Sequence, residues 1–281
     1  MRNLTQLTAS KLNRNSNLES LINSIELFSN TREEPFIVNF NKIKEILDIL
    51  SRVGVEEVAI ESAETEHGTI NTTVRGASAD RQIVVHHTFE EDLIDGVTIG
   101  IAALKPFLSR LNLFDMDKIK VSFDGTQEDG SVEQLTIKEG KRKITYRCYD
   151  IDYLGVPSQI PNNLATDDKF DFDNERVLYW IKVGNSLLQT ARDKEETKVS
   201  FSYDDSTIKI SIVDGEDKYE EEIEMNDIDL PSVDFTRWSL VPFSKLMKEA
   251  LAHGDRVKFG VTENGVAVVR MSDIDIALSP L

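Results

Sequence analysis

One local pattern recurs four times along the chain and constrains its fold more than any other feature. Each copy joins a short β-rich run, an amphipathic helix of about three turns and a second β-rich run. The copies are Phe36–Val53 with Glu57–Ser62, Val97–Leu113 with Lys118–Phe123, Val177–Lys194 with Lys198–Tyr203, and Trp238–His253 with Arg256–Val261. In the third copy we predict a strand over Val177–Val183 and a helix over Gly184–Lys194.

The spacing of the copies predicts two similar domains. Equivalent starting residues at Val38, Thr98, Tyr179 and Trp238 are separated by 60, 81 and 59 residues. The two matching intervals are the spacing of two units within one domain. The longer interval exceeds them by about 20 residues, which is the length of a linker between two such domains.

The linker and the remaining strands can be placed from turn chemistry. Residues 150–173 contain two prolines, a glycine and several Asp and Asn residues, which disfavours a continuous strand or helix. Alternating apolar and polar runs between the helices predict antiparallel strands. The fold class predicted is α+β: domains 35–149 and 174–281, each of two βαβββ units, with antiparallel sheets on one side and two helices on the other. Residues 1–34 form an N-terminal extension with one amphipathic helix, which a capping box at Ser16–Glu19 would begin.

Composition excludes several classes of protein. The 281 residues include 50 acidic and 32 basic ones, for a formal charge of −18, which argues against a broad basic DNA-binding surface and against anionic membranes. Cys148 is the single cysteine, so no intrachain disulfide and no cysteine-ligated zinc are expected. The sequence lacks a signal peptide and any apolar run of about 18 residues, so we expect a cytoplasmic protein.

Positive charge is concentrated in the four repeated helices. Their windows hold nine basic residues and four acidic ones, whereas the remainder of the chain is strongly acidic. A spaced array of cations on a shared surface is what a polyanion backbone needs, and no base-reading set accompanies it. The basic residues are Lys42, Lys44, Arg52, Lys105, Arg110, Arg192, Lys194, Lys245 and Lys248.

The four units, the central linker, the basic helices and the acidic remainder together resemble the sliding DNA clamps, over about residues 35–281. The two-domain kind, typified by PCNA and the clamps of tailed phages, is the nearest in pattern. The resemblance implies a non-catalytic homotrimeric ring without cofactors, whose helices face double-stranded DNA and whose outer surface carries sheets. It also implies tethering of a replicative DNA polymerase, loading by an ATP-driven clamp loader, and a cytoplasmic location, that of the host if the gene is a phage's.

The resemblance also assigns residues to two surfaces. The DNA-facing set is the nine basic residues above with His253. The partner-binding set lies in the linker and the C-terminal tail and consists of Leu154, Val156, Ile160, Ala277, Leu278, Pro280 and Leu281. These apolar residues could equally pin the linker and the last strand to the core.

Two other functions stay open at this point. A structural or assembly protein of repeated β-rich domains would share the repeat but have no DNA role. A hydrolase would need converging carboxylates, whereas the Asp-x-Asp pairs at residues 150, 227 and 273 lie in scattered loops. The sequence contains no phosphate-binding glycine loop. His86 and His87 are adjacent in an alternating run, which disfavours joint metal binding, and Cys148 lies in a strand-like run typical of a buried residue.

Overall fold

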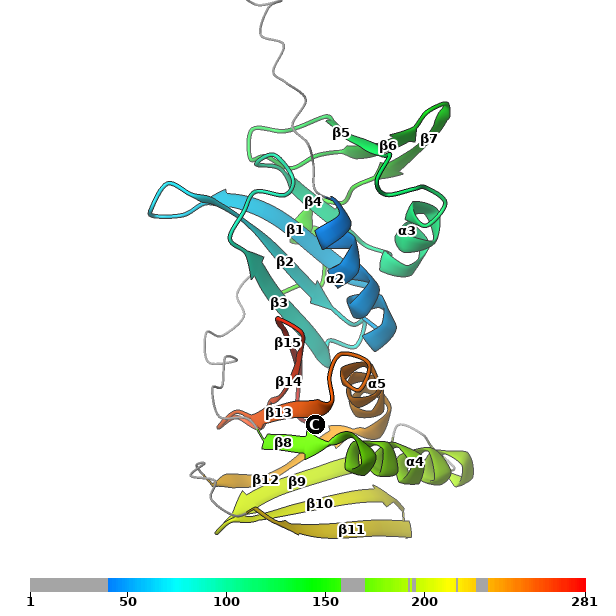
Figure 1. Cartoon of the computed structure of the whole chain (residues 1–281), viewed down its shortest axis with the longest axis vertical. Coiled ribbons are helices and arrows are strands. Elements are labelled where there is room, and N and C mark those ends of the chain that lie inside the picture. Colours follow the sequence, from blue (N-terminus) through cyan, green and yellow to red (C-terminus); the bar gives the residue numbers. More distant parts are fainter. Residues whose placement is uncertain (1–39, 158–169, 192, 194–195, 216, 226–231) are drawn as a thin grey trace, which may run out of the picture. The chain divides into compact units, whose positions relative to one another are not determined.

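The computed structural model describes residues 40–157, 170–191, 193, 196–215, 217–225 and 232–281 (Figure 1). The N-terminal helix predicted within residues 1–34 and the β-rich run before Phe40 lie outside these residues. In the described ranges the α-helices are α2 (Phe40–Val53), α3 (Leu104–Leu111), α4 (Asn174–Thr190) and α5 (Leu240–Ala250). A short 3-10 helix, η1 (Ile151–Tyr153), follows the first half of the chain.

The described strands form three antiparallel sheets. The largest has the order β4-β1-β2-β3-β15-β14-β13-β8, and the two smaller ones are β11-β10-β9-β12 and β5-β6-β7. The strands are β1 (Glu57–Glu64), β2 (Ile70–Ala77), β3 (Ile83–Phe89), β4 (Thr98–Ile101), β5 (Lys120–Asp124), β6 (Gln134–Glu139), β7 (Arg142–Arg147), β8 (Phe170–Asp173), β9 (Lys198–Asp204), β10 (Thr207–Asp214), β11 (Asp217–Glu224), β12 (Val233–Ser239), β13 (Arg256–Val261), β14 (Ala267–Met271) and β15 (Ile274–Leu278).

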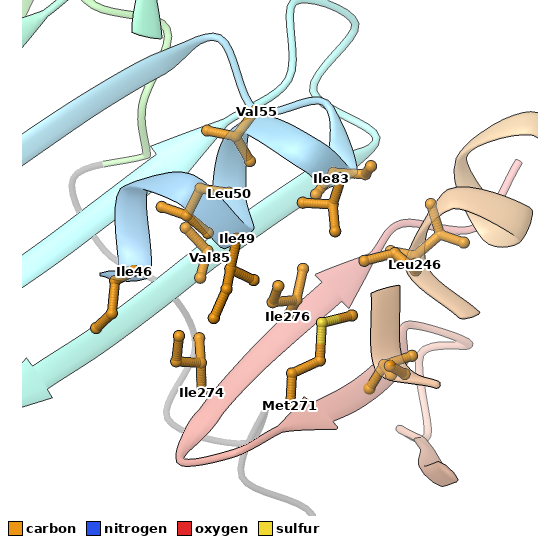
Figure 2. Packing of buried hydrophobic residues seen from close by; sticks show 14 of the residues in the cluster. Ile46, Ile49, Leu50, Val55, Ile83, Val85, Leu246, Met271, Ile274 and Ile276 are labelled. Carbon is orange, nitrogen blue, oxygen red and sulfur yellow. The ribbon is translucent and has the colours of Figure 1, made fainter. Parts of the chain in front are cut away.

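The pairing of β3 with β15 connects the two halves of the chain in one sheet. The two strands are antiparallel, with Val85 opposite Ile276 and Ile83 opposite Leu278. All four of these side chains are buried. Figure 2 shows this part of the core, where apolar side chains of α2, β3, β15 and α5 meet. The joint is therefore held by apolar packing as well as by the strand ladder.

The helices pack in series, α3 against α2, α2 against α5 and α5 against α4. Each buries an apolar stripe and leaves its opposite side to solvent, as helical periodicity requires. In α2 the buried stripe includes Ile43, Leu47 and Leu50, and in α5 it includes Phe243 and Leu246. Among the described helices, none has the length and apolar content needed to cross a membrane.

The α+β class with antiparallel sheets and two helices in each half is confirmed, but the prediction for the third copy is wrong in one element. Val177–Val183 is not a strand, because it forms the middle of α4. Its β-branched and aromatic residues favour a strand over a short window, yet Val177, Trp180 and Gly184 recur at helical spacing and are the buried positions. Within the range predicted as linker, Phe170–Asp173 forms β8 and pairs with β13.

Candidate nucleic-acid interface

Five basic side chains project from the exposed sides of the helices. They are Lys105 and Arg110 on α3, Lys182 on α4, and Lys245 and Lys248 on α5. Within the described residues none of the five forms an ion pair or a side-chain hydrogen bond. Their charge is therefore available to an external anion. Because α3, α2, α5 and α4 pack in series, the five cations belong to one continuous layer of helices.

Lys245 of α5 lies at the contact between α5 and α2. A Cβ built on Gly54 would lie 3.3 Å from Lys245 Nζ, so the ammonium group sits beside the C-terminal end of α2. Gly54 has a φ of +102°, and its amide donates to the Leu50 carbonyl, which ends the helix. The partial negative charge of a helix C-terminus favours a cation at this point.

Four other members of the predicted DNA-facing set already have acidic partners. Lys42 pairs with Glu91, and Lys44 Nζ lies 2.6 Å from Asp48 Oδ2 on the same helix. Arg52 Nε donates to Glu249 Oε1 at 2.7 Å, and His253 Nε2 lies 3.0 Å from the same oxygen. Arg52 belongs to α2 and Glu249 to α5, so this cluster ties the two halves of the chain together. These four residues carry compensated charge and are weaker candidates for phosphate contact.

The two remaining members of the predicted set lie outside the described residues, and one further exposed cation was absent from the set. Arg192 and Lys194 lie outside the described residues. Lys182 was missed because its segment was interpreted as a strand, whereas in α4 it lies on an exposed side. The helical recurrence of Val177, Trp180 and Gly184 was the signal that could have revealed it.

The predicted partner-binding residues have very different surroundings. Ala277 and Leu278 are buried in β15 opposite Val84 and Ile83, so they hold the last strand to the sheet. Leu154 is buried after η1, and Val156 is half-buried. Pro280 is exposed, and Leu281 is 59% exposed. Ile160 lies outside the described residues.

A cavity of about 550 Å³ lies between the two halves of the chain, beside the tail. Its lining comes from the end of α2, the turn between β2 and β3, the start of α5 and the last residue, and includes Gly54, Asp80, Ile83, Pro242, Lys245 and Leu281. The main chain of the tail closes one side, because Ser279 N donates to Gln82 O and Leu281 N donates to Arg237 O. Sequence reasoning identified the tail but missed the β2–β3 turn, since nothing local indicates that the two approach each other.

The residues considered for catalysis or metal binding are not brought together. His86 is exposed and His87 is half-buried on β3, and burial lowers the pKa of both imidazoles. Burial raises the pKa of the Cys148 thiol to about 12, so it is a neutral side chain at physiological pH. Among the described residues, no three His, Cys, Asp or Glu side chains are grouped as a metal site requires.

Comparisons with known proteins place this architecture among solved structures. The beta chain of DNA polymerase III from Streptococcus pneumoniae aligns with a TM-score of 0.60 and 14% identity, over 86% of this chain and 63% of that one. Proliferating cell nuclear antigen from Entamoeba histolytica aligns with a TM-score of 0.55 and 15% identity, over 85% and 94%. A Helicobacter pylori beta clamp bound to a DNA ligase peptide aligns with a TM-score of 0.57 and 15% identity, over 87% and 65%.

These similarities define the fold: the chain has the fold of the sliding DNA clamps. It spans less than two thirds of the length of the bacterial beta chains and nearly the whole of the Entamoeba protein. No protein-family model matches the sequence, and neither does any curated protein.

Proposed function

We propose that this protein is a sliding clamp, which encircles double-stranded DNA and tethers the replicative DNA polymerase without catalysing a reaction itself. The observation that carries the proposal is the layer of unpaired helix cations on a clamp fold whose formal charge is −18. Loose, sequence-independent contacts with phosphates need such cations, and the acidic remainder repels DNA elsewhere. Tethering raises the effective concentration of the polymerase at its template.

The same proposal includes an assembly and a set of partners. The chain comprises two clamp domains, residues 35–149 and 174–281, and three copies close into a ring around DNA. An ATP-driven clamp loader opens the ring and places it, in the cytoplasm. The support is the similarity to PCNA, of which this chain spans nearly the full length, together with the internal duplication.

The partner peptide would bind at the cavity between the two halves. A Helicobacter pylori beta clamp of the same fold carries a DNA ligase peptide, which supports a peptide as the occupant. Exposed Leu281 and half-buried Pro242 offer apolar contacts, and Lys245 and Asp80 offer charged ones at the rim.

Replacement of the unpaired cations tests the proposal. Lys182, Lys245 and Lys248 are changed together to glutamine, and DNA synthesis is measured on a primed circle with the polymerase and clamp loader of the source organism. We expect shorter products and unchanged assembly of the clamp. The matched control changes Lys209 and Lys258, two exposed lysines on the strands β10 and β13, and should leave product length intact. Full product length from the triple variant would refute the proposal that these helices face DNA.

A further inference from the structure

A polar hollow lies on the outer face of the sheet β11-β10-β9-β12, the face turned away from the helices. The helices α4 and α5 pack against this sheet on the side of buried Val199 and Phe201. Because side chains alternate along a strand, Lys198 and Ser200 of β9 project from the outer face. The hollow has a volume of about 400 Å³ and has no lining residue in common with the cavity beside the tail.

Short side chains in the two central strands create this hollow. Ser200 of β9 lies opposite Ser211 of β10, and the longer side chains of Arg237 and Glu220 continue the same row on β12 and β11. The row is therefore low in the middle and high at both ends. A molecule that enters the hollow meets hydroxyl groups at the floor and charged groups at the walls.

Two cations and a hydroxyl group of the hollow lack partners within the described part of the chain. Arg237 and Lys198 form no ion pair and no side-chain hydrogen bond there, and the Ser200 hydroxyl forms none either, although Ser200 is only 4% exposed. Arg237 is directly opposite Ser200, and Lys198 precedes Ser200 by two residues on the same face. A buried hydroxyl normally has a hydrogen-bond partner. Guanidinium, ammonium and hydroxyl side by side are the donors that an oxyanion such as a carboxylate needs.

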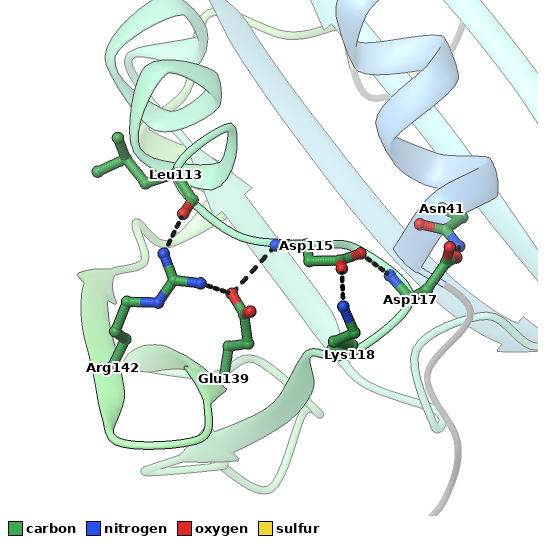
Figure 3. Close-up of polar contacts among 7 residues, drawn as sticks. All are labelled: Asn41, Leu113, Asp115, Asp117, Lys118, Glu139 and Arg142. Atoms are coloured by element: carbon green, nitrogen blue, oxygen red, sulfur yellow. Dashed lines mark hydrogen bonds and ion pairs between the residues drawn. The ribbon is translucent and has the colours of Figure 1, made fainter.

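The charged groups after α3 show a different arrangement, in which donors and acceptors satisfy one another. In Figure 3 Lys118 Nζ lies 2.5 Å from Asp115 Oδ2, and Arg142 Nη1 donates to the Leu113 carbonyl at 3.1 Å. Glu139 accepts from the Asp115 amide at 3.1 Å and also pairs with Arg142. The charges of this loop are compensated internally, unlike the two cations of the hollow.

An exposed aromatic ring borders the donors of the hollow. Phe235 is 60% exposed, and the guanidinium carbon of Arg237 lies 4.7 Å from the centre of its ring. A β-bulge places the ring there, because Asp234 and Phe235 together oppose Ser202 where the register of β12 with β9 shifts. Stacking on the ring orients the guanidinium and leaves its N–H groups free for a bidentate contact with a carboxylate.

We propose that the hollow binds an acidic peptide of a partner protein. Arg237, Lys198 and the Ser200 hydroxyl hold one carboxylate of the peptide, and an apolar side chain of the peptide packs on Phe235. Phe235 and Arg237 are two residues apart on one face of β12. An extended peptide also repeats its side chains on one face at every second residue, so the apolar and acidic residues of the peptide are two apart.

The charges around the hollow favour a peptide over a nucleic acid. A phosphate backbone needs a longer row of cations than two, and the carboxylates of Glu196 and Glu220 flank the pair that is present. A single carboxylate side chain fits between them. This site goes beyond the proposed function, since it depends neither on DNA nor on the cavity beside the tail.

Fluorescence anisotropy with two matched peptides tests the inference. One peptide repeats Phe-Ser-Glu-Ser, and the other has glutamine in place of each glutamate; both are capped and carry a neutral fluorophore. The full chain should bind the glutamate peptide about tenfold more tightly, because only a carboxylate makes the charge-assisted hydrogen bonds. The formal charge of −18 opposes this preference, so nonspecific attraction to the whole chain does not produce it.

Single substitutions locate the binding site. Arg237→Gln should weaken binding of the glutamate peptide about tenfold, and Phe235→Ser should weaken it about fivefold. Ser200→Ala should weaken it about threefold while leaving the urea midpoint unchanged or higher, because the hydroxyl has no partner to lose among the described residues. A merely structural role of Ser200 would instead lower the midpoint. Lys118→Gln is the control and should bind like the unmodified chain, since Lys118 already pairs with Asp115.

Three results would overturn the inference. Equal affinity for the two peptides, or binding of neither at millimolar concentration, would show that the hollow does not hold a carboxylate. Weaker binding in Lys245→Gln with unchanged binding in Arg237→Gln would move the peptide to the helix cations. Binding of oligothymidylate that exceeds that of the glutamate peptide and is lost in Arg237→Gln would make the hollow a nucleic-acid site. DNA synthesis on the primed circle tests the proposed function separately from all three.

Discussion

Replacing Arg52 by methionine should destabilise the fold while leaving the hold on DNA unchanged. Its Nε donates to Glu249 Oε1 at 2.7 Å, and the same oxygen lies 3.0 Å from His253 Nε2. Glu249 is buried, so its carboxylate depends on these two partners for hydrogen bonding. Methionine keeps most of the apolar stem of the arginine and removes the donor.

The size of the effect follows from the exposure of the two partners. Removing one partner of a fully buried ion pair costs about 3–5 kcal/mol. Here the Arg52 side chain is 53% exposed, which screens the pair, and His253 still serves the carboxylate. We therefore expect the free energy of unfolding to fall by about 1–2 kcal/mol.

Urea unfolding at one fixed protein concentration measures this change, with the fluorescence of buried Trp180 and Trp238 as the signal. A double-mutant cycle with Glu249→Gln should give a coupling energy of about 1 kcal/mol. Lys182→Gln is the control and should change stability by less than about 0.5 kcal/mol, because Lys182 is exposed in the middle of α4. A zero coupling energy, or weaker retention on DNA in the Arg52 variant, would refute the reasoning.

Three further predictions concern other parts of the chain. Gly100→Ala should lower the free energy of unfolding by more than about 3 kcal/mol, because the new Cβ would lie 2.0 Å from the Tyr149 carbonyl oxygen; a urea midpoint equal to that of the unmodified chain would contradict this. The Cys148 thiol, whose pKa burial raises to about 12, should react with Ellman's reagent at pH 8 at least about 100-fold more slowly in the folded chain than in urea, and equal rates would contradict its burial. Deleting Pro280 and Leu281 should weaken binding of a labelled peptide from the C-terminus of the polymerase while changing the free energy of unfolding by less than about 1 kcal/mol, and unchanged affinity would remove the tail from the partner site.

The repeat was predictable because local sequence patterns determine it. Apolar residues at helical spacing identified α2 and α5, and alternation with turn dipeptides identified hairpins such as β6–β7. Local reasoning failed at Val177–Val183, where strand-favouring residue types and helical spacing conflict and the packing of Trp180 and Gly184 decides for a helix.

The candidate interface was predictable only in part, since charge compensation depends on residues far apart in the sequence. The sequence located the basic helices, and five exposed cations on α3, α4 and α5 include four that it named. It could not show that Arg52 pairs with Glu249, which lies 197 residues away. For the same reason it could not show that Ala277 and Leu278 are buried against β3.

Retention on DNA of different topology tests the central claim most directly. The clamp loader places the protein on a nicked circular plasmid in a buffer that contains no polymerase. The complex is isolated by gel filtration, and half of it is then linearised with a restriction enzyme. A clamp that encircles DNA should stay with the circle and leave the linear molecule through its ends, because topology and not affinity holds it. Equal retention on circle and linear DNA, or no retention on either, would contradict the account.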